Sequence, residues 1–458
     1  MQKLDDQLEY RIERDTMGEM RVPKSALYGA QTQRAVENFP ISGFRLPRAF
    51  IQALGLIKSS AAKANGELGE VSPDMAAAIQ KAADDVSKGA HDDQFVVDIF
   101  QTGSGTSTNM NANEVIGHLA NAHPNDHVNR GQSSNDVIPT AIHVSAAMVT
   151  HDELLPAMAG LRDSLRRKAE EFQDVVKIGR THLQDAVPML LGQEFSGYSA
   201  QVQFCEERVR QALDGIYELP LGGTAVGTGL NAIPGFAAAT IREISQRTGQ
   251  PFRPARNYFQ AMAGKDAVCF LSGALKTYAV ALTKIANDIR WLGSGPRCGI
   301  GELKLPATQP GSSIMPGKVN PVIAESLLMV CAQVIGYDAS IAWSCAAGNF
   351  ELNVMMPVMA YDLLQSITLL AAGSRNFDEK CVRGLKADEE RATGFVEQSL
   401  AMCTVLAPVI GYEKAAAIAK KAHETGRTVR EVARETSGIG EEKLSELLDP
   451  RTQVGAHR

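Results

Sequence analysis

The stretch LSGALKTYAVALTKIANDI, residues 271–289, decides the fold class. Its large apolar residues recur in alternating steps of four and three. They are Leu271, Leu275, Tyr278, Leu282, Ile285 and Ile289. Because an α-helix completes a turn every 3.6 residues, this spacing places the six side chains on one face of a helix. A heptad-like run of this length is typical of a bundle of nearly parallel long helices.

Other segments carry the same signal. Residues 196–218 repeat it, with apolar positions at Tyr198, Val202, Cys205, Val209, Ala212 and Ile216. Residues 145–172 continue it, although Pro156 is expected to bend or break the helix there. Residues 327–343 and 355–370 are long and rich in apolar residues. The sequence therefore predicts about five long helices in its middle part.

The predicted helices are shorter before about residue 132 and after about residue 390. Ser72 precedes a proline, a pairing typical of an N-cap and the first helical position, and Gly89 is expected to close that helix. A helix over 412–424 is expected to end before Gly426, and Thr428 is expected to cap the next helix.

These patterns predict an all-α protein. The sequence shows no alternating strand pattern of useful length and no internal repeat. We expect a helical N-terminal domain over 1–132, a central long-helix bundle over 133–390 and a small helical C-terminal domain over 391–458. The glycine-rich segment GGTAVGTG, residues 222–229, follows no predicted strand. We interpret it as a corner between helices rather than a dinucleotide-binding loop.

The composition argues against a nucleic-acid-binding protein. The 458 residues include 46 Lys and Arg against 52 Asp and Glu, giving a net charge of −6. A nucleic-acid-binding protein normally shows a basic excess or a basic stripe. The small net charge still permits an anionic substrate, because a local cluster of donors and cations can outweigh it.

The termini and cysteines favour a cytoplasmic protein. The charged N-terminal segment MQKLDDQLEYRIERD contains no apolar run, so no signal peptide is expected. We expect no membrane span, because no window approaches the ~20 apolar residues that one requires. The seven cysteines are scattered and show no CxxC spacing. Reduced thiols explain them better than disulfides or a zinc site, and no metal ligand pattern is present.

Four stretches are too rich in small polar residues to lie in a core: 101–114, 123–136, 179–188 and 310–321. Each has a structural explanation when taken alone, because Ser, Thr, Asn and Gly are usual in turns and helix caps. Residues 133–136 could cap a helix, and a lone histidine such as His182 is more often structural than catalytic. Four such patches beside long helices favour a shared functional site, since loops at helix ends can converge.

The segment GSSIMPGKVNP, residues 311–321, resembles the signature of the fumarase/aspartase superfamily. Further segments resemble class II fumarase in the same order over nearly the whole chain. They are 15–18, 28–34, 91–94, 102–113, 123–126, 132–136, 179–185, 222–231 and 284–296. The resemblance implies the three-domain all-α fold of that superfamily and the reversible hydration of fumarate to L-malate without a cofactor. It also implies a homotetramer whose active sites draw residues from more than one chain.

The resemblance implies a role for each polar patch. Ser312 would be the base, His182 would act as the acid through a bound water, and Glu325 would orient the His182 ring. Lys318 would hold the substrate carboxylate and the charge that develops on it. The implied substrate-binding residues are Ser104, Gly105, Thr106, Ser133, Ser134, Asn135, Thr181, Ser313, Lys318, Val319 and Asn320. An implied secondary dicarboxylate site comprises His123, Pro124, Asn125 and Asp126.

An aspartase-type ammonia-lyase of the same superfamily is the main alternative. Aspartase typically has Gln after the Thr of the third patch and Ala in the loop, where this chain has His182 and Gly317. A catalytically silent structural homologue is a second alternative, yet the residues of the implied site are present. The departures from the fumarase pattern are a short segment between Glu114 and His123, His127 in place of an Asp, and Gly131 in place of a Ser.

The chemistry accounts for the composition of the loop. A serine hydroxyl is a poor base, and its activation requires roughly 6–8 kcal/mol, since each pKa unit corresponds to ~1.4 kcal/mol. The Lys318 ammonium at ~4 Å would supply about 4 kcal/mol at an effective dielectric constant near 20. Backbone N–H groups of the turn at 311–313 would supply ~3 kcal/mol each in a dry site. The glycines and prolines would let the loop close over the substrate.

Overall fold

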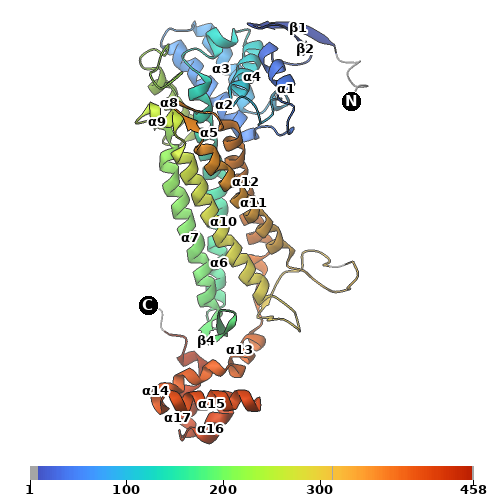
Figure 1. Ribbon diagram of the computed structural model, residues 1–458, viewed down its shortest axis with the longest axis vertical. Coiled ribbons are helices and arrows are strands. Elements are labelled where there is room, and N and C mark those ends of the chain that lie inside the picture. Colours follow the sequence, from blue (N-terminus) through green and yellow to red (C-terminus); the bar gives the residue numbers. More distant parts are fainter. Residues whose placement is uncertain (1–8, 312, 456–458) are drawn as a thin grey trace. The chain divides into compact units, whose positions relative to one another are not determined.

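The computed structural model describes residues 9–311 and 313–455, and these are mainly helical (Figure 1). They form two compact units, each built from three segments of the chain. Unit 1 contains the described residues up to Pro156, Glu207–Ala279 and Cys331–Ala371, and unit 2 contains Ala157–Glu206, Val280–Val330 and the described residues from Ala372 onward. The all-α prediction is confirmed. The unit boundaries cut the long helices, so the predicted domain limits at 132 and 390 stay a prediction.

All five segments predicted to be long helices are helical. They form α6 (Leu155–Glu171), α7 (Leu191–Ile216), α10 (Asp266–Leu292), α11 (Val322–Cys345) and α12 (Met356–Lys380). The break expected at Pro156 is present. A π-helical turn, η4 (Thr150–Leu154), separates α6 from α5 (Ser134–Val149), and Pro156 follows this turn as the second residue of α6.

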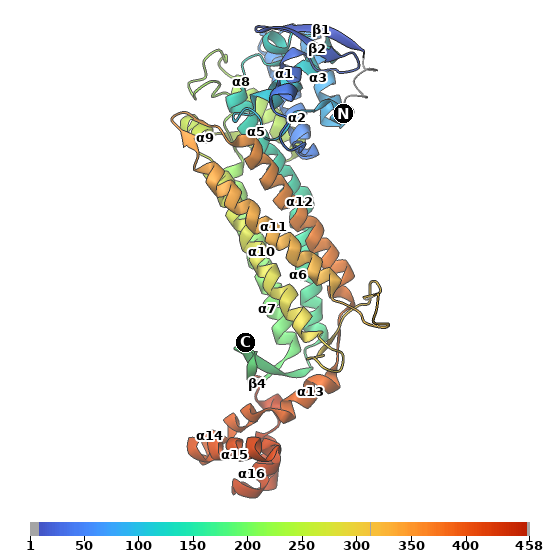
Figure 2. The same cartoon turned by 45° about the vertical axis from the view of Figure 1, so that its right-hand side comes forward.

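The portions of these helices that belong to unit 2 run side by side in both views (Figure 2). The Phe172 ring packs edge-on against Phe195, with ring centroids 5.2 Å apart. The Tyr198 hydroxyl donates to Asp288 Oδ2 over 3.0 Å and so joins α7 to α10. The heptad-like positions are buried, as expected for knobs that pack into a helical bundle.

Unit 1 also contains shorter helices. They are α1 (Ala30–Asn38), α2 (Arg48–Glu67), α3 (Pro73–Ser87), α4 (Thr106–Ala120), α8 (Phe236–Thr248) and α9 (Tyr258–Ala263). Helix α2 packs against α3, α5 and α8 and is buried along most of its length. Its approach to α3 requires Gly55, because a Cβ there would lie 2.6 Å from the Ser87 backbone nitrogen.

The helix caps predicted from the sequence are confirmed. The Ser72 hydroxyl accepts from the Met75 N–H at the start of α3, and Gly89 adopts a left-handed φ of +90° just beyond its end. Thr428 caps α16 (Val429–Thr436) in a reciprocal capping box with Glu431.

The described residues contain two hairpins, with strands of six or seven residues, that were not predicted from the sequence. The first pairs β1 (Tyr10–Asp15) with β2 (Gly18–Pro23), and the second pairs β3 (Val176–Thr181) with β4 (Gln184–Leu190). The alternation signal failed for β3 because its first four residues are all buried, a charged lysine among them. Such strands are not recognisable by a period of two.

Shorter strands complete the set of two-stranded sheets in the described residues. They are β5 (Glu218–Leu219) with β6 (Arg253–Pro254), β7 (Leu303–Lys304) with β10 (Lys386–Ala387), and β8 (Gly348–Asn349) with β9 (Leu352–Asn353). Strand β5 precedes residues 222–229, so the prediction that no strand comes before that segment is wrong. The segment still forms the corner between α7 and α8, as predicted.

The C-terminal part of unit 2 is a cluster of small helices. They are α13 (Glu389–Gln398), α14 (Ala407–Ile410), α15 (Tyr412–Thr425), α16 and α17 (Glu441–Leu447). Their buried core includes Val396, Leu406 and Val432, and it extends to Val176 and Ile178 of β3. The β3–β4 hairpin therefore rests on the C-terminal helices.

The expectation that no window resembles a membrane span is wrong for two helices. By length and composition, α10 and α11 are apolar enough to cross a membrane. The most apolar window of α10 is 56% buried inside the chain, whereas that of α11 is only 28% buried. Helix α11 also carries Asp338, which accepts from Ser272 and pairs with Lys276 of α10. Because so little of its apolar window is buried, α11 is expected to pack against a further apolar surface.

None of the seven cysteines forms a disulfide in the described residues, and three of them, Cys205, Cys331 and Cys381, are buried.

Candidate functional site

The first polar patch forms the N-terminal end of α4. Gly105 is the N-cap, with a left-handed φ of +72°, and it lies against Ile138 of α5, where a Cβ would come within 2.9 Å. The neighbouring Ser104 and Thr106 hydroxyls are 2.8 Å apart and share a hydrogen bond. The segment before α4 is also bonded to α12, because the Gly103 carbonyl accepts from the Met356 N–H over 3.0 Å. The patch thus holds two hydroxyls at the positive end of a helix.

The second patch forms the N-terminal end of α5. Ser133 and Asp136 form a capping box, in which the Ser133 N–H donates to Asp136 Oδ1 over 2.9 Å. Helix capping, the structural explanation for this patch, therefore accounts for Ser133 and Asp136. The side chains of Ser134 and Asn135 make other contacts. The Asn135 side chain donates to the Ala225 carbonyl over 2.8 Å.

Asp136 ties this patch to the glycine-rich corner at 222–229. Its second carboxylate oxygen accepts from the N–H groups of Gly222 and Thr224, each over 2.9 Å. The side chain is fully buried, and burial raises the pKa of Asp136 to about 6. The backbone donors act in the opposite direction by stabilising the carboxylate.

The two helix ends lie together in unit 1. Asn109, on the second turn of α4, donates from Nδ2 to the Ser134 hydroxyl at the first residue of α5 over 3.0 Å. Two N-termini with hydroxyl side chains therefore face a common region. This arrangement is suited to an anion, since the positive ends of the two helix dipoles favour negative charge there.

A buried lysine stabilises the segment that precedes the second helix end. Lys58 of α2 is fully buried, and its ammonium donates to Asn129 Oδ1 over 3.0 Å and to Gln132 Oε1 over 2.9 Å. Burial lowers the pKa of Lys58 to about 7, while the Asp136 charge opposes that shift. Lys58 fixes the segment that leads into Ser133.

The third patch is the turn of the β3–β4 hairpin in unit 2. Thr181 is the last residue of β3, and His182 and Leu183 form the two-residue turn. Both turn residues have a left-handed backbone, with φ of +56° and +61°. The side chains of Thr181, His182 and Leu183 are exposed. The hairpin thus presents His182 at its tip.

The fourth patch is a closed loop in unit 2. The Gly311 N–H donates to the Lys318 carbonyl over 3.0 Å, and the Asn320 side chain donates back to the Gly311 carbonyl over 2.6 Å. Gly311 cannot carry a side chain, because a Cβ would lie 2.2 Å from the Lys318 carbonyl oxygen. Ser313, Lys318 and Val319 are exposed. Ser312 lies outside the described residues, so its predicted role is untested.

Glu325 lies in the first turn of α11, as predicted, close to the positive end of that helix. In the part of the chain that the structure describes, no hydrogen bond or ion pair joins Glu325 to His182. The predicted pairing of the two side chains therefore stays a prediction.

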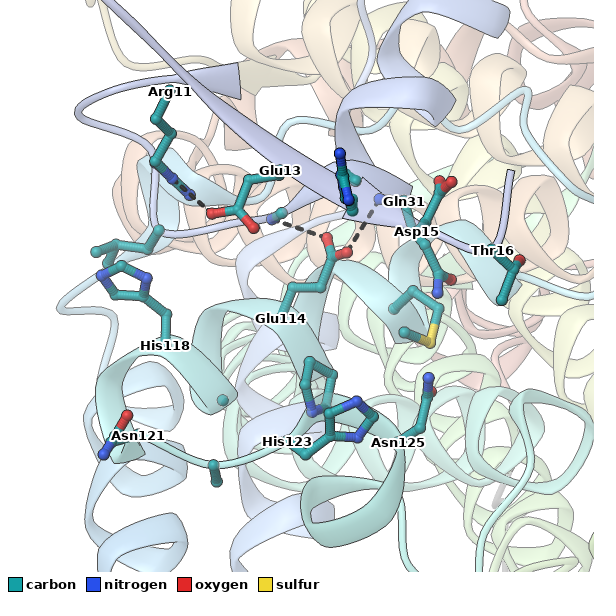
Figure 3. A pocket seen from close by; sticks show the side chains of 18 residues that line it. Arg11, Glu13, Asp15, Thr16, Gln31, Glu114, His118, Asn121, His123 and Asn125 are labelled. Carbon is teal, nitrogen blue, oxygen red and sulfur yellow. Dashed lines mark hydrogen bonds and ion pairs between the residues drawn. The ribbon is translucent and has the colours of Figure 1, made fainter. Parts of the chain in front are cut away.

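The predicted secondary site lies beside a cavity of about 820 Å³ in unit 1. Figure 3 shows Glu114 of α4 at the centre of its lining, with His123 and Asn125 below it in that view. His123 caps the π-helical turn η3 (Pro124–Val128), since its Nδ1 accepts from the Asp126 N–H over 3.1 Å. His127 accepts from the His123 N–H over 3.0 Å, so it stabilises this turn.

The charge of that cavity is mixed. Arg11 and Arg14 line it, but so do the carboxylates of Glu13, Asp15 and Glu114. Glu114 is satisfied by the backbone N–H groups of residues 29, 31 and 32 and by the Thr32 hydroxyl. Three carboxylates against two guanidinium groups do not favour a dianionic ligand. A dicarboxylate at His123–Asp126 stays a prediction.

Sequence reasoning missed several residues that shape these patches. Asn109 lies within the quoted stretch 101–114 but was not assigned a role. Lys58 interrupts the apolar run LGLIKSSAA, and a charge inside a buried helix was the available signal. Arg180 and Glu302 form a bidentate pair across 122 residues of sequence, and no local pattern reveals such a contact.

Among the described residues, no cluster of three or more His, Cys, Asp or Glu side chains could hold a metal ion.

Comparisons with known proteins agree with the fold described above. Residues 18–336 match a family described as lyase, and residues 402–454 match one described as fumarase C C-terminus. The chain is 52% identical to "Fumarate hydratase class II" of Xylella fastidiosa (strain Temecula1) over 98% of its length and 96% of the relative's. It is likewise 52% identical to the protein of that name from Mycobacterium tuberculosis, over 98% and 96% of the two chains. The crystal structure of recombinant class II fumarase from Schistosoma mansoni is 42% identical, with a TM-score of 0.96 over 98% of this chain and 100% of that one.

Proposed function

The chain belongs to the class II fumarate hydratase family, and from this premise we propose a specific reaction and a division of labour among its residues. The protein is a lyase that adds water reversibly across the double bond of fumarate to give L-malate. The observation that carries the proposal is the pair of helix N-termini joined by Asn109 and Ser134.

These N-termini suit a dicarboxylate that must also leave again. Ser104, Thr106 and Ser134 offer neutral hydroxyl donors, and the helix ends add partial positive charge without a permanent ion pair. Asn135, Ser313 and Asn320 would supply further donors. Lys318 would supply a full positive charge for one carboxylate.

In the dehydration direction, Ser312, deprotonated to an alkoxide, takes the proton from the carbon next to one carboxylate and becomes a hydroxyl. The electron pair of the broken C–H bond moves into that carboxylate and gives an aci-carboxylate, in which this group carries two negative charges. Lys318 stabilises the added charge. His182, acting through a bound water and oriented by Glu325, then protonates the departing hydroxyl. The reverse sequence hydrates fumarate.

Each active site is proposed to combine several chains of a homotetramer. The His182 tip and residues 313–319 are exposed, and no bond joins His182 to Glu325 within the described part of one chain. Helix α11 exposes large apolar side chains, with Met329 68% and Trp343 77% exposed. Packing the long helices of four chains against one another would cover this apolar surface and bring the polar patches together.

The proposed cellular setting is the cytoplasm. The interconversion of fumarate and L-malate is a step of the tricarboxylic acid cycle, and seven cysteines without a disulfide in the described residues are consistent with a reducing compartment. No cofactor is required, because the mechanism needs only proton transfers and electrostatic stabilisation.

An aspartase-type reaction is not favoured, since the relatives described above are named fumarate hydratases. The test is to incubate the purified protein separately with L-malate and with L-aspartate. We expect fumarate from L-malate and no ammonia from L-aspartate. Ammonia release at a comparable rate would contradict the proposal.

A further inference from the structure

The turn that carries His182 has an unfavourable backbone. A two-residue hairpin turn with positive φ at both central residues normally uses Asn or Gly, which tolerate this conformation. Here the residues are His182 and Leu183. Their side chains raise the steric cost of the left-handed region. The neighbouring structure must therefore hold the turn in place.

An ion pair lies two residues before His182. The Arg180 guanidinium donates through Nη1 to Glu302 Oε2 over 3.0 Å and through Nη2 to Glu302 Oε1 over 2.8 Å. Glu302 has no exposed surface, and 19% of the Arg180 side chain is exposed. Two parallel bonds fix the guanidinium plane as well as its position, which a single contact does not do.

A second cation shares the same carboxylate. The Lys177 ammonium lies 3.6 Å from Glu302 Oε2 and 3.3 Å from Glu194 Oε2 of α7. It also donates to the Ile178 carbonyl over 3.0 Å, and its side chain is 2% exposed. Glu302 thus contacts a cation near each end of β3, the strand that leads into His182.

Glu302 is itself held independently of these side chains. Its carbonyl accepts from the Asp388 N–H over 2.9 Å, and the next two residues form β7, which pairs with β10. The adjacent Lys304 pairs with Asp388 over 2.8 Å. The backbone at Glu302 is therefore held by β10 and Asp388, and the hairpin is bonded to the Glu302 carboxylate.

We propose that Arg180 and Glu302 are positioning residues for His182: their buried bidentate pair holds the strained turn so that the imidazole points towards the substrate. The inference rests on the proposed role of His182 as the acid. Neither residue touches the substrate, and both act through the hairpin.

A purely structural role makes a different prediction. If the pair only stabilised the fold, its loss would lower activity equally whether or not residue 182 is a histidine. If the pair acts through the imidazole, its loss has little left to affect once the imidazole is gone. A double-mutant cycle separates the two cases.

The experiment measures L-malate dehydration by full-length wild type, Arg180→Lys, His182→Asn and the double variant. We expect Arg180→Lys to lower kcat by about tenfold or more with KM changed less than about threefold, because it retains charge but loses the planar fork. In the His182→Asn background, the same substitution should change the residual kcat less than about twofold.

Two further variants keep the result interpretable. Arg430→Lys disrupts a bidentate pair with Glu397 elsewhere in unit 2, which is more exposed than Arg180–Glu302, and should leave kcat unchanged. Glu302→Asp shortens the side chain that bears the carboxylate but keeps its charge, so it should lower kcat as Arg180→Lys is expected to do. It serves as the test if Arg180→Lys does not fold. Equal losses in both residue-182 backgrounds, or wild-type kcat in both Arg180→Lys and Glu302→Asp, would overturn the inference. Failure of the wild type to form fumarate would instead contradict the proposed function.

Discussion

Asn109 Nδ2 donates to the Ser134 hydroxyl over 3.0 Å, and this bond joins the N-terminal ends of α4 and α5. Asn109 is 1% exposed, so the bond forms in a dry environment where it is costly to break. It places the hydroxyl-bearing ends of two helices, which are separated by a loop in the sequence, beside one another.

Replacing Asn109 with leucine should weaken substrate binding. The side chain keeps its approximate size but loses the donor that fixes Ser134. We expect the KM for L-malate to rise about tenfold, equivalent to roughly 1.4 kcal/mol, with a smaller change in kcat. Steady-state kinetics measure both. Asn111→Leu is the control, since Asn111 bonds to the Gln94 carbonyl and the Val96 N–H instead, and it should leave KM unchanged.

The buried Lys58 predicts a pH dependence of stability. Its pKa falls from 10.5 to about 7 on folding because burial disfavours the ammonium. Between these values the folded chain binds fewer protons than the unfolded chain, so this contribution to stability rises with pH. Urea unfolding at several pH values should show the wild type gaining stability relative to Lys58→Met from about pH 7 to about pH 10. A stability difference that stays constant over this range would contradict the assigned shift.

His182 and Glu325 should behave as one unit. We expect His182→Asn to lower kcat severely and Glu325→Gln to lower it in part, because the carboxylate acts by orienting the imidazole. The double variant should be no slower than His182→Asn alone. Additive losses in the double variant would show that the two side chains act separately.

Shared active sites predict complementation between inactive chains. Ser312→Ala and His182→Asn subunits are each expected to be inactive in homogeneous tetramers. After subunit exchange, some sites should receive both wild-type residues and regain activity, provided the two residues come from different chains. Sedimentation should show a tetramer. A fully active monomer, or no recovery after exchange is verified, would count against shared sites.

The sequence predicted the elements better than their contacts. The run from Leu271 to Ile289 and the caps at Ser72 and Thr428 depend on neighbouring residues, so local rules identify them. The β3–β4 hairpin was missed because β3 is buried along most of its length and gains its stability from the C-terminal helices. Tertiary packing, rather than alternation, determines that it forms a strand.

For the candidate site, too, the sequence predicted individual residues but not the distant residues that support them. Family resemblance gave roles to His182, Lys318 and Ser104, and the structure supplies the local geometry of each patch. Support from distant residues was not predictable, because Glu302 lies 122 residues from Arg180 and the Lys58 ammonium contacts residues more than 70 positions away. Such contacts arise only when the chain folds.

The identity of the base can be tested with one pair of variants. We expect Ser312→Ala to abolish turnover without loss of the fold, because the methyl side chain cannot accept a proton. Ser313→Ala should retain a measurable kcat with a raised KM. Loss of activity in Ser313→Ala with near wild-type activity in Ser312→Ala would assign the base to the other hydroxyl.

The most direct measurement follows the ultraviolet absorbance of fumarate after L-malate is added to purified wild-type protein, with Ser312→Ala as the blank. We predict a rise to a steady equilibrium level with the wild type and none with the variant, and the same final level when the wild-type reaction starts from fumarate. No change with the wild type, or an equal rise with Ser312→Ala, would contradict fumarate hydration at the site described.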